Sequence, residues 1–174
     1  MSESRELPPN LVIRRLSPND SLVELTALLH RAYKRLLDMG LHYTATVQTE
    51  EVTRRRVSTG ETWVAAVGSR VVATVTLRIT APEDDAAWYR RSEVANFQQF
   101  AVEPELQGCG VGGLLMGVIE ERARQLGASE LACDTAENAA HLIAYYARRS
   151  YREVGIEDWR PKVNYRSVIL SKQL

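Results

Sequence analysis

The segment from Phe97 to Met116 constrains this chain most, because it gathers four glycines between a predicted strand and a predicted helix. The strand pattern ends at Val102, Pro104 then turns the chain, and a helical spacing of apolar residues follows until Gly127. The glycines at this junction are Gly108, Gly110, Gly112 and Gly113. Glycine permits a positive φ and exposes the backbone, and the first turn of a helix carries unpaired N–H groups with a partial positive charge. We therefore predict a backbone cradle for an anion such as a pyrophosphate.

Two other glycine-rich nucleotide motifs fit this segment poorly. A P-loop requires Lys and then Ser or Thr after its last glycine, whereas Gly113 is followed by Leu114 and Leu115. A dinucleotide fold places its glycine turn early in a repeated parallel βαβ pattern, but a predicted hairpin over residues 63–79 comes first here. From the glycines alone, a phosphate-ligand binder unrelated to either motif stays open.

The composition is typical of one compact domain with its own core, since 45% of the 174 residues are hydrophobic. We expect a flexible N-terminus over residues 1–10 and a single domain over residues 11–174. The 22 basic residues balance the 22 acidic ones, which favours neither nucleic acid nor a membrane surface as a partner. No apolar run has the length of a signal-peptide core or a membrane span, so we expect a cytoplasmic protein.

The cysteines and histidines are too scattered for a metal site. Cys109 lies among the glycines and Cys133 in an apolar stretch, and no histidine stands at ligand spacing from either of them. We therefore expect neither a bound metal nor a disulfide framework.

The periodicity of apolar residues predicts a chain that mixes helices and strands. Strands are expected at residues 11–16, 63–67, 71–79, 94–102, 131–133 and 163–170, and helices at residues 22–38, 50–57, 110–126 and 139–149. The connections at residues 41–48 and 80–92 are interpreted as surface loops. Ligand specificity is expected to lie in the loops over residues 38–49 and 80–92.

The run Gln107-Gly108-Cys109-Gly110-Val111-Gly112 resembles the cofactor loop of the GCN5-related N-acetyltransferase (GNAT) family, and Phe100 to Pro104 before it matches as well. The resemblance implies an α/β (α+β) fold with a mixed, mostly antiparallel twisted sheet and helices on both faces. It also implies acetyl-CoA as the cofactor. By resemblance, the pantetheine arm pairs with the strand at Phe100, Ala101 and Val102. The pyrophosphate is then held by the amides of Gln107, Gly108, Cys109, Gly110, Val111, Gly112 and Gly113.

A second stretch, from Asn138 to Tyr151, resembles the family's signature of Asn, Ala, Tyr and Gly-Phe. Aligning Tyr151 with the aromatic of that signature places Tyr146 at the family's tyrosine, although Ser150 replaces the usual glycine. The resemblance implies that Tyr146 contacts the cofactor and donates a proton to the departing thiolate, and that Asn138 caps the helix or contacts the cofactor. Tyr145 stays an alternative, because adjacent helical residues point about 100° apart.

Acyl transfer to an amine also needs a base, donors for the oxyanion and a site for the cofactor's phosphates. By resemblance, the backbone N–H of Val102 meets the oxyanion. The base stays open among Glu83, Asp84, Asp85, Glu93, Glu103 and His141. The basic pair Arg148-Arg149 is better placed than Arg54-Arg55-Arg56 for the ribose phosphate, and Trp63, Trp88 and Trp159 stay unassigned.

Taken with the resemblance, these residues predict an N-acetyltransferase that acts on a primary amine, with a small molecule preferred, by direct attack in a ternary complex. The alternatives are a non-catalytic acyl-CoA sensor or interaction module and a protein N-acetyltransferase. An exposed final strand at residues 163–170 would support a homodimer through edge pairing.

Overall fold

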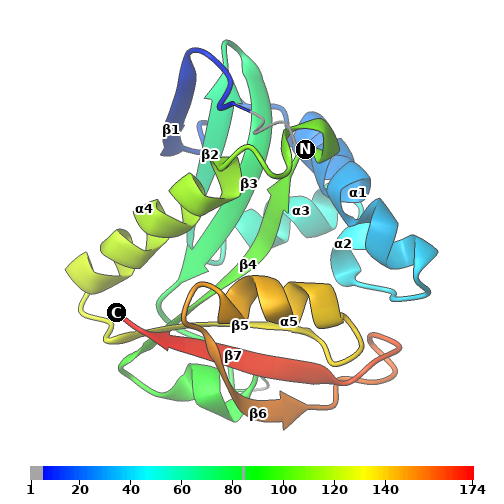
Figure 1. Ribbon diagram of the computed structural model, residues 1–174, viewed down its shortest axis with the longest axis vertical. Coiled ribbons are helices and arrows are strands. Elements are labelled where there is room, and N and C mark those ends of the chain that lie inside the picture. Colours follow the sequence, from blue (N-terminus) through cyan, green and yellow to red (C-terminus); the bar gives the residue numbers. More distant parts are fainter. Residues whose placement is uncertain (1–5, 84) are drawn as a thin grey trace.

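Seven strands form one sheet in the order β1-β2-β3-β4-β5-β7-β6, of which only the β4–β5 pair is parallel (Figure 1). The computed structural model describes residues 6–83 and 85–174. The strands are β1 (Leu11–Arg15), β2 (Glu61–Val67), β3 (Arg70–Arg78), β4 (Val94–Val102), β5 (Glu130–Ala136), β6 (Arg152–Glu157) and β7 (Ser167–Gln173). The α-helices are α1 (Leu22–Asp38), α2 (Thr44–Val47), α3 (Glu50–Val57), α4 (Val111–Gln125) and α5 (Ala140–Ala147). The predicted mixed, mostly antiparallel sheet is confirmed.

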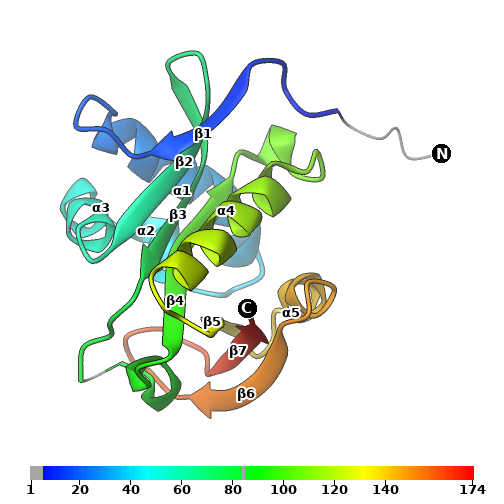
Figure 2. The same cartoon turned by 90° about the vertical axis from the view of Figure 1, so that its left-hand side faces the viewer.

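The helices cover both faces of this sheet, with α4 and α5 on one side and α1 and α3 on the other (Figure 2). Helix α4 buries one stripe of apolar side chains against the sheet, at the spacing that a 3.6-residue period gives. These side chains are Val111, Leu115, Met116, Ile119 and Ala123. Helix α1 does the same on the opposite face with Leu25, Leu28 and Leu29. The predicted covering of both faces is therefore confirmed.

The two central strands separate halfway along their length, and this separation positions the site. Strands β4 and β5 are in register only from Val94 to Asn96. Strand β4 then carries a bulge, where its register with β3 shifts and Gln99 has a φ of 54°. A bulge bends the strand that contains it, so the remainder of β4 turns away from β5. The edge of β4 beyond Asn96 is thus open to a ligand.

The C-terminal strands differ from the prediction. Strand β7 begins at Ser167, so the strand predicted from residue 163 starts too early, and β6 was not predicted from the pattern. The residues of β6 are mostly exposed and include Gly155, which explains the weak apolar signal. Strand β7 lies between β5 and β6, so the predicted edge pairing through this strand is wrong. The strands at the ends of the sheet are β1 and β6.

Three other segments depart from the sequence interpretation. The loop at 41–48 contains α2, and the connection at 80–92 contains a 3-10 turn whose Tyr89 is buried. Strand β5 extends from Glu130 to Ala136, beyond the predicted residues 131–133. The prediction was too short because polar residues of the strand interrupt the apolar run on which it rested. Of the predicted flexible N-terminus, residues 1–5 lie outside the described part of the chain, as does the candidate base Asp84. Within the described residues, no helix combines the length and apolar character needed to cross a membrane.

Candidate active site

Two cavities meet where β4 and β5 separate. The larger has a volume of about 640 Å³ and lies between β4, α1, the N-terminal turn of α4, and α5 with the residues that follow it. The smaller has a volume of about 360 Å³ and lies among β4, β5 and the segments around residues 85 and 162. Both are lined by Tyr33, Tyr43, Phe100, Asp134 and Tyr146. Two ligands held in the two cavities would therefore meet at these side chains.

The glycine-rich loop forms one end of the larger cavity. Gly108 and Gly110 have φ values of 82° and 92°, which residues other than glycine rarely adopt. Gly112 lies close to neighbouring side chains, because a Cβ there would lie 3.1 Å from Cζ of Phe100 and 3.4 Å from Cγ2 of Val102, which would then have to shift. Helix α4 begins after Gly110 without a side-chain cap, so its first N–H groups have no side-chain partner. Such a helix start suits the negative charge of a phosphate.

Arginine side chains surround the rest of this cavity. Arg35, Arg148 and Arg149 line it, and none of them pairs with a carboxylate in the described part of the chain. The Arg149 guanidinium stacks on the Tyr145 ring, 3.8 Å from its centroid. These positive charges complement a ligand that carries several phosphates. The prediction placed Arg148 and Arg149 here, whereas Arg35 was not predicted.

The structure brings most of the predicted cofactor residues to this cavity. It is lined by Phe100, Ala101, Val102, Gln107, Gly108, Gly110, Gly112, Gly113 and Tyr146. The side chains of Cys109 and Val111 are buried beneath the loop, so only their backbones remain candidates. Asn138 is exposed and lies outside the cavity lining. Its predicted capping role is wrong, because Ala139 is the N-cap of α5 and makes no side-chain cap bond.

The two adjacent tyrosines of α5 lie differently. Tyr146 is buried and lines both cavities, whereas Tyr145 is half-buried and lines only the larger one. Burial raises the pKa of the Tyr146 phenol well above its usual value. The phenol therefore stays protonated at neutral pH and keeps a hydrogen to donate at the point where the cavities meet.

Asp134 is a candidate that the sequence interpretation missed. It lies in β5 and lines both cavities, surrounded by protein but with part of its surface open to them. The Tyr89 hydroxyl donates to its Oδ1 at 3.1 Å and the Ser167 hydroxyl to its Oδ2 at 3.0 Å. Burial raises the pKa of the Asp134 carboxyl, and the charge of Asp85 adds to the shift, against the opposing effects of both hydrogen bonds and of the Arg56 charge. The sequence feature that could have identified Asp134 is a carboxylate within a strand of mostly buried residues.

Of the predicted bases that the structure describes, Asp85 and His141 line the cavities and the others lie elsewhere. Asp85 lines the smaller cavity, but it pairs with Arg78 at 2.8 Å. Glu103 is fully buried and pairs with two arginines, while Glu93 pairs with an arginine at the surface. His141 lines the larger cavity, where burial and then the charge of Arg35 lower the pKa of its imidazole. Glu83 is exposed and absent from the lining of either cavity.

A glycine-rich helix start at the open edge of β4, next to a second polar cavity, is the arrangement expected of a group-transfer protein with a phosphate-bearing co-substrate. Residues 25–151 match the Acetyltransferase (GNAT) family. This match covers more than half of the chain, so the protein belongs to that family, as the resemblance predicted. Acetyl-CoA is the co-substrate of the family, and the larger cavity has the glycine cradle, the arginines and the open strand edge that fit it.

Solved structures of the family share the fold. An IAA acetyltransferase from Bacillus cereus has a TM-score of 0.68 and 23% identity, over 94% of this chain and 99% of that chain. A GNAT family acetyltransferase from Elizabethkingia anophelis, with acetyl-CoA bound, has a TM-score of 0.68 and 16% identity, over 96% and 100% of the two chains. A Bacillus subtilis acetyltransferase in complex with CoA has a TM-score of 0.65 and 19% identity, over 94% and 99%. A comparison with curated protein sequences gave no match.

Proposed function

We propose that this protein is an acetyl-CoA-dependent N-acetyltransferase that acetylates a primary amine on a small molecule. The observation that carries the proposal is the meeting of the two cavities at Tyr146 and Asp134. The larger cavity would hold acetyl-CoA, the acetyl donor, and the smaller cavity offers a polar space for the amine that accepts the acetyl group. This arrangement supports direct attack within a ternary complex, because both substrates can be present together.

Different residues of the chain would then act as base, proton donor and oxyanion donor in the acetyl transfer. Acetyl-CoA would supply an acetyl group activated as a thioester. Asp134 would take the proton that an ammonium group must lose before its nitrogen can attack, and its raised pKa suits that task. The Tyr146 hydroxyl would donate its hydrogen where the sulfur leaves. The backbone N–H of Val102 remains our candidate for the donor to the developing oxyanion.

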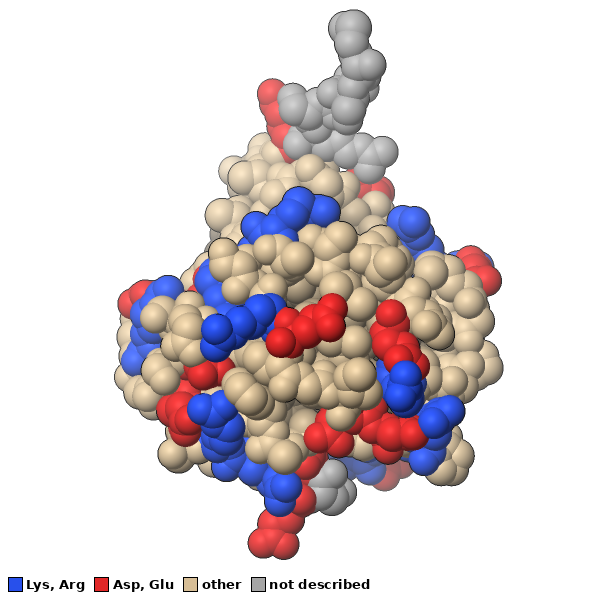
Figure 3. Space-filling model, turned by 60° about the horizontal axis from the view of Figure 1, so that its bottom comes forward, with Lys and Arg blue, Asp and Glu red and all other residues tan. Residues whose placement is uncertain are grey.

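Asp134 favours a catalyst over a passive acyl-CoA sensor. A sensor needs the larger cavity but has no use for a buried carboxylate at the junction, where burying a charge is costly. A small acceptor is favoured by the volume of the second cavity, about 360 Å³. On the face shown in Figure 3, basic and acidic side chains lie interspersed, which does not favour a highly charged macromolecule as the acceptor.

The test is calorimetric binding of acetyl-CoA to the wild type and to two variants of α4. Gly113 lines the larger cavity, so Gly113→Trp should fill the phosphate cradle and abolish binding. Gly117 lies one turn further along the same helix, where a Cβ would meet no other atom within 4 Å, so Gly117→Trp is the matched control. The control should bind as the wild type does. A folded wild type that does not bind acetyl-CoA would overturn the proposal.

Acetyl transfer is tested next, by thiol release from acetyl-CoA with a panel of small amines. Release that depends on the amine would support catalysis. Tight acetyl-CoA binding with no amine-dependent release would favour the sensor instead, and release with peptides alone would favour a protein N-acetyltransferase.

A further inference from the structure

Two cations that line the smaller cavity have no carboxylate partner in the described part of the chain, the exposed Lys162 and the half-buried Arg56. Arg78 and Asp85 neutralise each other at 2.8 Å, with side chains only 12% and 15% exposed. The Arg78 Nε also donates to Oδ1 of Asn96 at 2.6 Å, so this guanidinium is already committed. Arg56 lines the same cavity, and no carboxylate in the described part of the chain pairs with it. Its contacts are with glutamine side chains.

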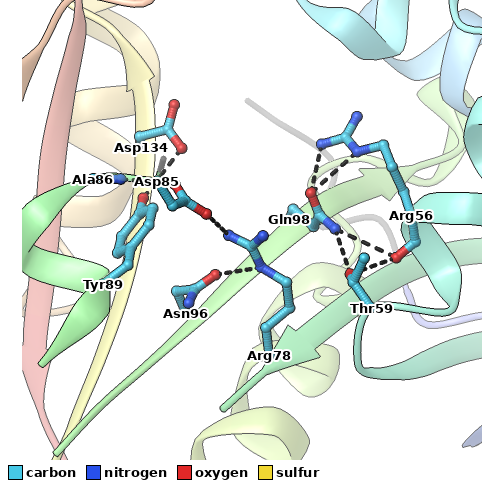
Figure 4. Close-up of polar contacts among 9 residues, drawn as sticks. All are labelled: Arg56, Thr59, Arg78, Asp85, Ala86, Tyr89, Asn96, Gln98 and Asp134. Atoms are coloured by element: carbon cyan, nitrogen blue, oxygen red, sulfur yellow. Dashed lines mark hydrogen bonds and ion pairs between the residues drawn. The ribbon is translucent and has the colours of Figure 1, made fainter. Parts of the chain in front are cut away.

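Arg56 comes from the basic run of α3, whose other two members behave differently. Arg54 and Arg55 are exposed, and Arg54 forms an ion pair with Glu50 within the helix. Arg56 instead points toward the sheet, on the opposite side of an open space from Asp134 and Asp85 (Figure 4). Burial lowers the pKa of its guanidinium from the usual value, but a guanidinium stays charged at neutral pH.

Neutral amides fix the orientation of this guanidinium. Oε1 of Gln98 accepts from Nε and Nη2 of Arg56 at 3.1 and 3.0 Å, and Oε1 of Gln48 accepts from Nη1 at 2.9 Å. The Gln98 amide cannot be reversed without loss, since its Nε2 donates to Oγ1 of Thr59 at 2.9 Å. These bonds use part of the guanidinium's five N–H groups and leave the others for a ligand. A half-buried guanidinium that neutral amides orient, and with which no carboxylate of the described residues pairs, suits a ligand carboxylate, which a guanidinium can bind with two parallel hydrogen bonds.

We infer that the acceptor is a small amino acid-like molecule, whose carboxylate binds Arg56 and whose amine faces Asp134 and Tyr146. This inference rests on the proposed acetyltransferase function and names its substrate class. The two charges of such a zwitterion match the two charged groups that face each other across the cavity. The aromatic side chains that line the cavity, including Tyr89, would contact the body of the molecule.

The same electrostatics disfavour two other classes of amine as acceptors. A polyamine would bring a second cation toward Arg56, which repels it. A decarboxylated amine of the same shape would leave the Arg56 charge uncompensated. Both are expected to be poorer acceptors than the amino acid, because binding would then leave a buried charge unpaired.

The experiment compares the common protein amino acids with their decarboxylated counterparts, such as L-phenylalanine with phenethylamine and L-tryptophan with tryptamine, and includes spermidine. Acetylation is followed by thiol release, and binding by calorimetry in the presence of CoA. We expect at least one amino acid to be preferred over its amine by about tenfold or more in kcat/KM, the effect of one charge-assisted hydrogen-bonded pair.

Variants of α3 then test the assignment to Arg56. In Arg56→Gln, the KM of the preferred amino acid should rise about 10- to 100-fold while that of the matched amine stays unchanged, so the preference disappears. Arg56→Lys keeps the positive charge but not the planar guanidinium with its paired N–H donors, so it should retain part of the preference for the amino acid over the amine. Arg55→Gln removes the same charge from the adjacent exposed position and is the control, which should behave as the wild type. Circular dichroism and thermal unfolding confirm that each variant is folded.

The outcomes separate this inference from the function on which it rests. Loss of acetyl-CoA binding by the wild type would overturn both. Acetyl-CoA binding together with acetylation of phenethylamine, tryptamine or spermidine in preference to every amino acid would overturn the inference alone. The same holds if no amino acid in the panel binds or reacts, or if Arg56→Gln keeps the wild-type preference.

Discussion

At the scale of single residues, the site depends on the carboxyl of Asp134, whose surroundings disfavour its charged form. Asp134 is buried among aromatic side chains, and Tyr89 and Ser167 alone donate hydrogen bonds to it in the described structure. An environment that raises the pKa of a carboxyl makes it a stronger base at neutral pH. Groups of this kind occur at functional sites because the fold must sacrifice stability to keep them.

Replacing Asp134 with Asn should therefore separate activity from stability. We expect kcat to fall about 100-fold, in the range lost with a general base. Because the pKa of Asp134 is raised in the folded state, its contribution to stability is present below the unfolded pKa and is lost as the pH rises through the folded pKa. Asp134→Asn should thus unfold at the same temperature as the wild type, or a higher one, at pH 8. A loss of both activity and folded structure would contradict this prediction.

The same group should set the acidic limb of the pH–rate profile. Asp134 acts as a base only when deprotonated, so kcat/KM for the amine should rise with pH through its raised pKa. The measurement is a profile of thiol release from pH 5 to pH 9, with the amine below its KM. In Asp134→Asn, this limb should disappear, and a limb that persists would assign it to another group or to the amine.

The tyrosines of α5 offer a matched pair of variants. Tyr146→Phe removes the hydroxyl at the meeting point of the cavities and should lower kcat about 100-fold, with little change in acetyl-CoA affinity. Tyr145→Phe keeps the ring on which Arg149 stacks and should change kcat little. Single-turnover thiol release measures the effect on the chemical step. The reverse pattern would assign the proton donor to Tyr145.

At the scale of elements, one buried carboxylate anchors the turn between β4 and α4. Glu103 is fully buried and forms ion pairs with Arg31 of α1 and Arg70 of β3, at 2.5 and 3.1 Å. Its own N–H donates to the carbonyl of Val72 at 2.8 Å. The strand end that precedes the glycine loop is thus tied to a helix on one face and to the neighbouring strand.

Glu103→Ala should lower the free energy of unfolding by about 2 kcal/mol. Breaking a buried ion pair costs more than this, but the partner arginines here are 45% and 58% exposed and can be solvated again. Urea denaturation measures the change. As a control, Glu121→Ala removes an exposed carboxylate that pairs only within α4 and should cost less than about 0.5 kcal/mol.

At the scale of the whole molecule, ligand binding should couple the two halves of the sheet. The larger cavity is bounded by β4 on one side and by α5, which follows β5, on the other, so a ligand there would bridge the separated strands. Acetyl-CoA at about 100 times its Kd adds about 2.7 kcal/mol to stability, which for a domain of this size raises Tm by about 5–10 °C. Thermal unfolding with and without acetyl-CoA measures this. Gly113→Trp should show no shift, whereas Gly117→Trp should show the full one.

The parts of the protein that follow local rules could be predicted from the amino-acid sequence alone. Strand β4 lies at the predicted residues, and α4 begins and ends within a residue of its predicted bounds, because glycine conformations and helical periodicity act over a few residues. The glycine loop was predicted for the same reason, and the family match confirms the resemblance that rested on it.

Which polar groups meet depends on how the elements pack together. Asp134, Tyr89 and Ser167 come from three separate segments, and their contact depends on strand pairing that no local pattern encodes. Three consecutive arginines have the same residue type, so the sequence could not single out Arg56, which packing turns inward while Arg54 and Arg55 face solvent. Periodicity thus predicts the elements, whereas burial and the separation of β4 from β5 decide which side chains form the site.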